Sequence, residues 1–315
     1  MVKELYFDTI ILGGGPAGLT SGIYCARGNL KTAIIDISMF GGQPSNYLEL
    51  ENYPGFNLIG GFELMEKFEQ HADKFSVNKY PMQEIQKIDL LQNIKTIETL
   101  DYIFKAQTVI IATGAQPKKL NIKGEQEFIG KGVSYCAVCD GAFYKDKTVS
   151  IIGGGNSAIE EAIYLTRFAN KVFVIHRRDS LRADKIIQNR AFNNNKIEFL
   201  YNFVPIEING LDKVSSLTIQ NTIDNSILNL PTDGVFPYIG IQANTQYFHN
   251  QLQLTKEGFI ITDENMQTSV KGVFAVGDVR NTPLRQVITA AADGAIAANA
   301  AVRLLDSIQS VSELK

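Results

Sequence analysis

The sequence predicts an α/β protein built from two similar strand–turn–helix–strand units, and three observations support this fold class. Residues 7–36 ("FDTIILGGGPAGLTSGIYCARGNLKTAIID") and 147–176 ("KTVSIIGGGNSAIEEAIYLTRFANKVFVIH") resemble each other at a constant offset of 140. In both stretches, apolar runs typical of strands flank a segment whose apolar residues repeat at helical spacing. The chain has 315 residues, 45% hydrophobic and 20% charged, a globular composition that favours about two domains.

The glycines of the two copies fall at matching positions. Each copy starts with a β-branched run (9–11 and 149–152) that leads into a glycine turn, and each ends in a second apolar run (32–35 and 172–175). The spacing fits the dinucleotide-binding pattern G-x-G-x-x-G/A, in which small residues allow a tight turn, close approach of a pyrophosphate and close helix–strand packing. The matching residues are Gly13, Gly15 and Gly18 in the first copy and Gly153, Gly155 and Ala158 in the second. A single glycine triplet also occurs in ordinary turns, but two copies predict two Rossmann-like (three-layer ββα) nucleotide-binding domains.

The residues that end the second strand differ between the copies. Asp36 ends the first copy, where a carboxylate can accept hydrogen bonds from a ribose 2′-OH and would repel a 2′-phosphate. The second copy has His176, Arg177 and Arg178 at this place, followed by Arg182. Guanidinium groups suit a phosphate dianion, although a solvated basic loop is the alternative. These residues therefore predict that the first site binds FAD or NAD and that the second site binds NADPH.

Two later segments favour a flavin at the first site. Residues 108–120 form an apolar run that ends in Thr113 and Gly114, and residues 271–305 form a run ending at Asp278 followed by a long Ala-rich stretch. An aspartate at the end of a strand suits a polyol hydroxyl, and a helix beginning near Arg285 and Gln286 would favour the negative charge of a reduced flavin. The alternative for the Ala-rich stretch is a tightly packed core helix, and both can hold. In the connection 39–56, the amides of Gln43 and Asn52 could bond the polar edge of a flavin ring.

A Cys-x-x-Cys pair, Cys136 and Cys139, is followed by Asp140. The spacing permits a redox centre, half of a zinc site or a structural coincidence. A zinc site would need four ligands, and the sequence holds no second Cys-x-x-Cys or His-x-x-His to complete one. Asp140 is either a proton partner for the cysteines or a turn residue. Cys25 lies at an apolar position of the first helical stretch and is expected to be a small buried residue. His71 and His249 lack ligand-like partners and are expected to be inert, so no metal is predicted.

The charge balance restricts the partners. The net charge is −3 and the isoelectric point about 5.7, so no broad basic surface is expected to hold nucleic acid or anionic lipid. No run approaches the ~18 apolar residues of a membrane span. The start lacks the features of a signal peptide, and three cysteines do not make a secreted disulfide framework, so a cytoplasmic protein is expected.

Taken together, these motifs resemble the low-molecular-weight thioredoxin reductases. The resemblance runs along nearly the whole chain through "GGGPAG", "GGQ", "ENYPG", "IIATGA", "CAVCDGAFY", "GGGNSAIEEA", "HRRDSLRA", "GVFAVGD" and "RQVITAAADG". It implies a discontinuous FAD domain, 1–116 plus 247–315, with an inserted NADPH domain, 117–246. The implied FAD contacts are Gly13, Gly15, Pro16, Ala17, Gly18, Asp36, Gly42, Gln43, Asn52, Thr113, Gly114, Asp278, Arg285, Gln286 and Val287. The implied NADPH contacts are Gly153, Gly155, Asn156, Ser157, Ala158, His176, Arg177, Arg178 and Arg182.

The resemblance also implies an activity. Hydride would pass from NADPH to FAD and then to a Cys136–Cys139 disulfide, which would reduce oxidised thioredoxin by thiol–disulfide exchange. Cys139 would face the flavin, Cys136 would attack the partner, and the enzyme would be a homodimer. Larger relatives of the glutathione-reductase type carry their cysteine pair soon after the first glycine motif, and here residues 41–46 contain none. Asn156 and Val138 depart from the commoner Asp and Thr of the family without altering the chemistry.

Four alternatives remain at this stage. They are the same flavoprotein core with another disulfide partner (a glutaredoxin-like or peroxidase system), a ferredoxin-driven variant, a non-catalytic flavin-binding redox sensor and a zinc-binding module.

Overall fold

The computed structural model describes residues 2–47 and 49–313, and the chain divides into two compact units. Unit 1 holds Met1–Gln116 and Gln242–Lys315, and unit 2 holds Pro117–Ile241. The second division therefore falls at 241/242 and not at the expected 246/247. The physical reason is packing, because Asn244 N bonds Gly114 O at 3.0 Å and Ala243 is buried in the core of unit 1.

Unit 1 is centred on a mostly parallel sheet. Its order is β3-β2-β1-β6-β5-β4, with β16 also paired to β6. Pairing is parallel except between β4, β5 and β6, so one edge of the sheet is an antiparallel meander. The strands are β1 (Lys3–Leu12), β2 (Thr32–Ile35), β3 (Asn78–Tyr80), β4 (Ile85–Asp89), β5 (Lys95–Thr99), β6 (Tyr102–Ile111) and β16 (Val273–Ala275). Leu12 lies opposite Ile35 and Ile111, so the carboxyl ends of three strands meet at one edge, where a doubly wound sheet binds its ligand.

Alternate residues of β1 belong to two different cores. Ile10 and Leu12 pack with Phe248, whereas Ile11 packs with Leu19 and Ala297 on the other face. This is the period-two alternation of a strand that is buried on both sides.

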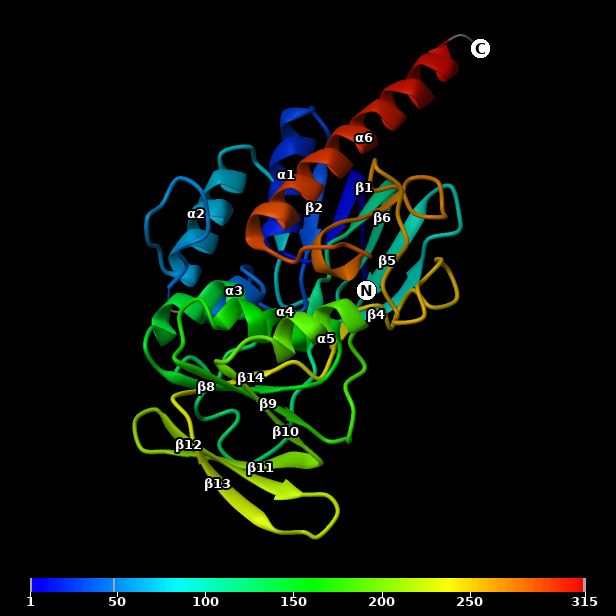
Figure 1. Ribbon diagram of the computed structural model, residues 1–315. Coiled ribbons are helices and arrows are strands. Elements are labelled where there is room, and N and C mark those ends of the chain that lie inside the picture. The colour runs from blue at the N-terminus through cyan, green and yellow to red at the C-terminus, as the bar shows by residue number, and fades with distance from the viewer. Residues whose placement is uncertain (1, 48, 314–315) are drawn as a thin grey trace. The chain divides into compact units, whose positions relative to one another are not determined.

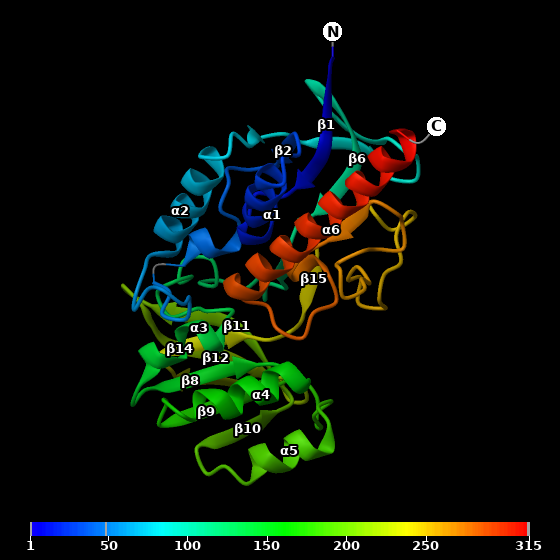
Figure 2. The ribbon, with the colours of Figure 1, turned by 90° about the horizontal axis from the view of Figure 1, so that it is seen from above.

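Two long-separated helices cover one face of this sheet. They are α1 (Pro16–Arg27) and α6 (Val287–Glu313), which lie side by side in Figures 1 and 2, and α2 (Gly61–Asp73) lies beside α1. Close approach requires small residues, because a Cβ on Gly294 would collide with the backbone of Ala17 and one on Gly28 would lie 2.6 Å from a methyl of Val302. The Ala-rich stretch is thus a packed core helix along part of its length.

The same helix is unusually apolar. Residues Val287–Ile308 are long and apolar enough to cross a membrane by length and composition, contrary to the expectation that no stretch would be, although core helices pass the same criterion. Ala297, Ala298, Ala301 and Leu305 are nevertheless buried within unit 1.

Unit 2 has three layers, which Figure 1 shows as helices, a parallel sheet and an antiparallel sheet. The parallel sheet has the order β10-β9-β8-β14, and the antiparallel sheet has the order β11-β12-β13. The strands are β8 (Thr148–Ile152), β9 (Lys171–His176), β10 (Ile197–Tyr201), β11 (Phe203–Gly210), β12 (Val214–Asn221), β13 (Ile227–Pro231) and β14 (Gly234–Pro237). The helices are α3 (Ala137–Asp140), α4 (Asn156–Leu165) and α5 (Lys185–Phe192). This arrangement confirms the predicted ββα layering.

The chain passes between the units twice. The two crossings are β7 (Ala115–Pro117) and β15 (Ile241–Ala243), which pair with each other. Three short 3₁₀ turns complete the fold: η1 (Gln43–Asn46) and η3 (Gly277–Val279) in unit 1, and η2 (Gly141–Tyr144) in unit 2.

Candidate functional site

The first glycine turn joins β1 to α1 as the fingerprint predicts. Gly13 has φ +110°, and a Cβ there would collide with the carbonyl oxygen of Ala112, so only glycine fits. A Cβ on Gly18 would collide with the carbonyl oxygen of Gly13, which explains the third small position of the motif. Pro16 and Ala17 begin α1, where proline costs no hydrogen bond. The N-terminus of α1 is therefore open to a phosphate.

Asp36 follows β2 at the same edge of the sheet. Its Oδ2 accepts a hydrogen bond from Gly14 N at 2.6 Å, and its Oδ1 accepts from Ser38 N and Oγ at 2.8 and 2.9 Å. These donors fix the carboxylate beside the glycine turn. Because each oxygen has two lone pairs, acceptor capacity remains for ribose hydroxyls.

The loop 39–59 closes on the glycine turn and on the start of α6. Gly41 N donates to Gly14 O at 2.9 Å, and Gly42, with φ +63°, lies against Gly15. Asn52 Nδ2 donates to Gln286 Oε1 at 3.0 Å. Gln43 begins η1, in the same loop. Expected flavin contacts from distant parts of the sequence are therefore brought together.

Thr113 and Gly114 follow β6 and are held by a residue that sequence reasoning missed. Asn244 Nδ2 donates to Thr113 O at 2.7 Å, and Thr113 Oγ1 donates to Asn244 O at 2.9 Å. No local motif marks Asn244, because its partners lie 131 residues away. Gly114 has φ +69°, a backbone conformation that favours glycine. A Cβ at this position would meet open space, so there is also room beside Gly114.

Asp278 lies in η3, one residue after Gly277. Burial raises the pKa of its carboxyl from 3.8 to about 6; Arg285 opposes this shift, and Asp293 adds to it. Burial also lowers the pKa of the Arg285 guanidinium, which lies over the ring of Phe259 at 4.4 Å. Arg285 Nε is buried and has no hydrogen-bond partner within the described residues. An orphaned donor beside a buried carboxylate fits a polar ligand that lies against both.

The second glycine turn joins β8 to α4 in unit 2. A Cβ on Gly153 would lie only 2.5 Å from Tyr238 O and 2.7 Å from the Ala158 side chain, whereas one on Gly155 would meet open space. Asn156 and Asp184 bond each other twice, through Asn156 Nδ2 to Asp184 Oδ2 and Asp184 N to Asn156 Oδ1, both at 2.8 Å. Sequence reasoning missed Asp184, although its place just after the basic run hinted at it. Ser157, on the first turn of α4, is exposed.

His176 ends β9 and is buried beside the second turn, where a Cβ on Gly154 would collide with its ring. Burial, followed by Arg182, Arg178 and Arg177, lowers the pKa of the imidazole, while a hydrogen bond with Ser180 opposes the shift. His176 Nε2 is buried without a hydrogen-bond partner in the described part of the chain. The imidazole ring therefore lies against the glycine turn with one ring nitrogen, Nε2, unbonded by the described residues.

The three arginines after β9 are exposed. Arg182 N donates to Gly154 O at 2.7 Å, which ties the arginine loop to the glycine turn. Within residues 2–47 and 49–313, no carboxylate lies within 4 Å of the guanidinium of Arg177, Arg178 or Arg182. Unpaired guanidinium groups beside a glycine turn fit a phosphate group.

Cys136 and Cys139 form a disulfide at α3. Cys136 N donates to Ser134 Oγ at 3.1 Å, Ala137 N donates to Tyr238 Oη at 2.8 Å, and Cys139 N donates to Cys136 Sγ at 3.1 Å. An amide that donates to Cys136 Sγ would also stabilise a thiolate on that sulfur. Ser134 and Tyr238 gave no signal in the sequence, since neither belongs to a Cys-x-x-Cys pattern.

Asp140 follows Cys139 and is the last residue of α3. Burial raises the pKa of its carboxyl, and a hydrogen bond with Ser134 acts in the opposite direction. Asp140 also helps to raise the pKa of Tyr144, for which burial is the larger cause. Ser134 thus bonds both the backbone of Cys136 and the carboxyl of Asp140, which holds Asp140 close to the backbone of the disulfide turn.

The described residues hold no group of three or more His, Cys, Asp or Glu that could bind a metal ion. Cys25 is buried and free, and burial raises the pKa of its thiol to about 12. It is therefore inert.

Comparisons with known proteins identify the family of the chain. A model of the family described as pyridine nucleotide-disulphide oxidoreductase matches residues 7–294. A thioredoxin reductase of Bacillus subtilis (strain 168) is 45% identical over 312 residues, which cover 98% of each chain. The crystal structure of a thioredoxin reductase from Streptococcus pyogenes MGAS5005 is 47% identical with a TM-score of 0.91, covering 96% of this chain and 99% of that one.

A third relative has a different name. A ferredoxin-flavin thioredoxin reductase from Clostridium acetobutylicum is 31% identical with a TM-score of 0.53, covering 97% of this chain and 99% of that one. These similarities extend over nearly the whole chain and at levels that establish kinship. The chain belongs to the pyridine nucleotide-disulphide oxidoreductase family and, within it, to the thioredoxin reductases.

Proposed function

We propose that this protein is an NADPH-dependent thioredoxin-disulfide reductase. One observation carries the proposal: the Cys136–Cys139 disulfide lies on a chain that also has two glycine turns with opposite charge preferences. Asp36 beside the first turn suits a nucleotide without a 2′-phosphate, and the arginines beside the second suit one that carries it.

FAD is the proposed ligand of unit 1, and NADPH that of unit 2. The residues present fit both groups, since Arg285 Nε and His176 Nε2 are buried polar atoms that find no partner among the described residues, and Gly155 leaves space beside the second turn. When bound, FAD would supply the chemistry that converts the hydride of NADPH into reducing equivalents for a disulfide. Gly13–Gly18 and Asp36 would hold its nucleotide, and Asp278 and Arg285 its polyol and ring.

The cysteines would carry the exchange. Two electrons and two protons convert the Cys136–Cys139 disulfide into two thiols. The Cys136 thiolate attacks the partner's disulfide, which forms a mixed disulfide and releases one partner sulfur as a thiolate. Cys139 then attacks Cys136 Sγ, which restores the internal disulfide and releases the reduced partner. The amide of Cys139 supports the assignment of Cys136 as attacking sulfur, because it donates to that sulfur.

Asp140 is the proposed proton partner. Burial raises the pKa of its carboxyl, which favours the protonated form, and Ser134, which bonds both Asp140 and the Cys136 amide, keeps it close to the backbone of Cys136. It would deliver a proton to the departing sulfur of the partner.

A coupled assay tests the proposal. The purified protein with FAD should oxidise NADPH only when a thioredoxin disulfide is present, and anaerobic titration should take up about two hydride equivalents per chain, one each for flavin and disulfide. Rapid turnover with a glutaredoxin-like or peroxidase partner but none with any thioredoxin would favour the alternative acceptor. Uptake of a single equivalent would argue for a flavin-binding sensor.

NADPH is preferred to ferredoxin as donor because of the unpaired arginines of unit 2. The relative from Clostridium acetobutylicum, named for ferredoxin, shares this family, so the fold alone does not decide the donor.

The cytoplasm is the proposed location.

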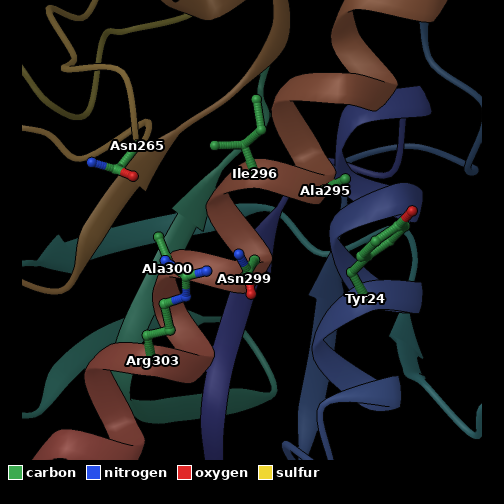
Figure 3. A pocket seen from close by; sticks show the side chains of 7 residues that line it. All are labelled: Tyr24, Asn265, Ala295, Ile296, Asn299, Ala300 and Arg303. Atoms are coloured by element: carbon green, nitrogen blue, oxygen red, sulfur yellow. The ribbon is translucent and has the colours of Figure 1, made fainter.

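A homodimer is the proposed assembly. Within unit 1, a pocket of about 480 Å³ is lined by Tyr24 of α1 and Ile296 of α6. Figure 3 shows these two side chains with the other lining residues, Ala295, Asn299, Ala300, Arg303 and Asn265. Tyr24 and Ile296 are 45% and 40% exposed, which leaves an apolar face that a second copy could cover. Ile296→Glu should lower the mass measured by light scattering, whereas Ile223→Glu, on the β12–β13 turn, should not. A monomeric wild-type protein would reject the dimer.

A further inference from the structure

A buried aspartate of α6 is bonded to the turn that carries Asp278. Asp293 is 9% exposed, and its Oδ2 accepts from Gly277 N at 3.0 Å and from Arg280 Nη1 at 3.1 Å. Arg280 Nε in turn donates to Thr262 Oγ1 at 2.9 Å. Asp293 thus joins α6 to both ends of η3, and Asp278 lies between the two bonded residues.

Stability alone is a weak reason for this arrangement. The side chains of Arg280 and Asp293 are only 14% and 12% exposed, so both charges lose most of their hydration. A well-packed apolar pair of similar volume would often be as stable or more stable. What an apolar pair cannot do is accept the buried amide hydrogen of Gly277, which Asp293 Oδ2 accepts at 3.0 Å at the start of the turn.

We propose that Asp293 is a positioning residue for the flavin site, which holds the Gly277–Val279 turn so that Asp278 meets a polyol hydroxyl of FAD. The inference rests on the proposed FAD site. Asp293 would act only through Gly277 and Arg280, without touching the ligand itself. Arg280 donates to the Asp293 carboxylate and also to Thr262. The side chains of Asp293, Arg280 and Thr262 thus form one hydrogen-bonded chain, called the brace below.

The experiment measures the Kd of FAD for apoprotein by flavin fluorescence quenching. Asp293→Asn leaves an acceptor for Gly277 but breaks the ion pair, and we expect FAD to bind about tenfold more weakly, since small misplacements of a bound group have large effects. Thr262→Val removes only the outer bond and should weaken FAD in the same direction by a smaller factor. Asp306→Asn, on an exposed part of α6, is the matched control and should leave the Kd unchanged.

Two readouts separate positioning from general destabilisation. NADP⁺ affinity, which depends on unit 2, should be unchanged in every variant. The pH dependence of FAD affinity should also shift. The charged groups around Asp278 are Arg285 on the loop before α6, Asp293 on α6 and Arg280 in the same turn, while α1 presents the apolar Ala17. Removing the negative charge of Asp293 should move the midpoint of that dependence to lower pH.

The outcomes are distinct. Weak FAD binding by the wild type itself would reject the proposed flavin site and not only the brace. Tight binding by the wild type, with an unchanged Kd and pH midpoint in Asp293→Asn, would overturn the positioning role, even if the variant melts earlier. If Asp293→Asn fails to fold, Thr262→Val decides: an unchanged Kd there likewise rejects the brace.

Discussion

Asn52 and Gln286 bond each other through their side-chain amides, with Asn52 Nδ2 3.0 Å from Gln286 Oε1 across 234 residues of sequence. One lies in the loop 39–59 and the other immediately before α6. The bond fixes two segments that would otherwise order separately when a cofactor binds. The proposed flavin site would thus be partly assembled before its ligand arrives, which would lower the entropic cost of binding.

A double-mutant cycle tests this coupling. Asn52→Ala and Gln286→Ala should each weaken FAD binding by apoprotein, and the double variant should lose less than the sum of the two. We expect a coupling free energy of about 0.5–1 kcal/mol, the usual range for an exposed hydrogen bond. Strictly additive losses, measured by fluorescence titration, would show that the two amides act independently.

Replacing Cys136 tests the electron path. Cys136→Ser should retain FAD binding and flavin reduction by NADPH, because neither needs that sulfur, yet thioredoxin reduction should fall by at least about 100-fold. Stopped-flow absorbance measures flavin reduction, and insulin precipitation measures thioredoxin turnover. Cys25→Ala, which removes a buried and unreactive thiol, is the control. Substantial thioredoxin reduction by Cys136→Ser would mean that electrons leave by another route.

Removing two arginines tests the coenzyme preference. Arg177→Ala with Arg178→Ala should raise KM for NADPH about 100-fold and leave KM for NADH nearly unchanged, because only NADPH carries the 2′-phosphate. Steady-state kinetics with both coenzymes measure the ratio. Arg190→Ala, an exposed arginine at the end of α5, serves as control. An unaltered preference would remove the phosphate role from these residues.

Glu161 offers a test of stability against pH. Burial raises the pKa of this carboxyl from 4.5 to about 7, with a smaller contribution from Glu160, and its Oε2 is buried without a hydrogen-bond partner among the described residues. Between pH 4.5 and about 7, Glu161 is still protonated in the native state but has lost its proton in the unfolded chain. The contribution of this group to the free energy of unfolding is therefore complete below pH 4.5 and is lost as the pH rises through about 7.

Glu161→Gln should therefore stabilise the protein at pH 8 by about 2 kcal/mol, a value reduced for partial solvent exposure, and should have little effect at pH 4.5. Urea unfolding of the apoprotein at the two pH values provides the measurement. Glu160→Gln, the exposed neighbour, should change stability little at either pH. Equal effects of Glu161→Gln at both pH values would place its proton affinity near the ordinary range.

Local patterns in the sequence predicted the parts of the site that depend on backbone geometry. Gly13 and Gly153 occupy backbone conformations that other residues rarely adopt. Glycine is therefore required at these positions, and its presence in the sequence is enough to predict the turn. The strand–helix–strand repeat followed from periodicity, whereas the Cys136–Cys139 disulfide was implied by the family resemblance, since the spacing alone left three interpretations open.

Tertiary structure alone decided the rest, because the partners are far apart in the chain or depend on burial. Asn244 holds Thr113 and Tyr238 holds the backbone of Ala137, and no local motif marks either residue. Asp293 lies within the motif "RQVITAAADG", but only the fold shows that it holds Gly277. The second division between the units falls at 241/242 because residues after it pack into the first core. Burial also sets the raised pKa values of Asp278 and Glu161, since only folding determines which carboxyl loses its water.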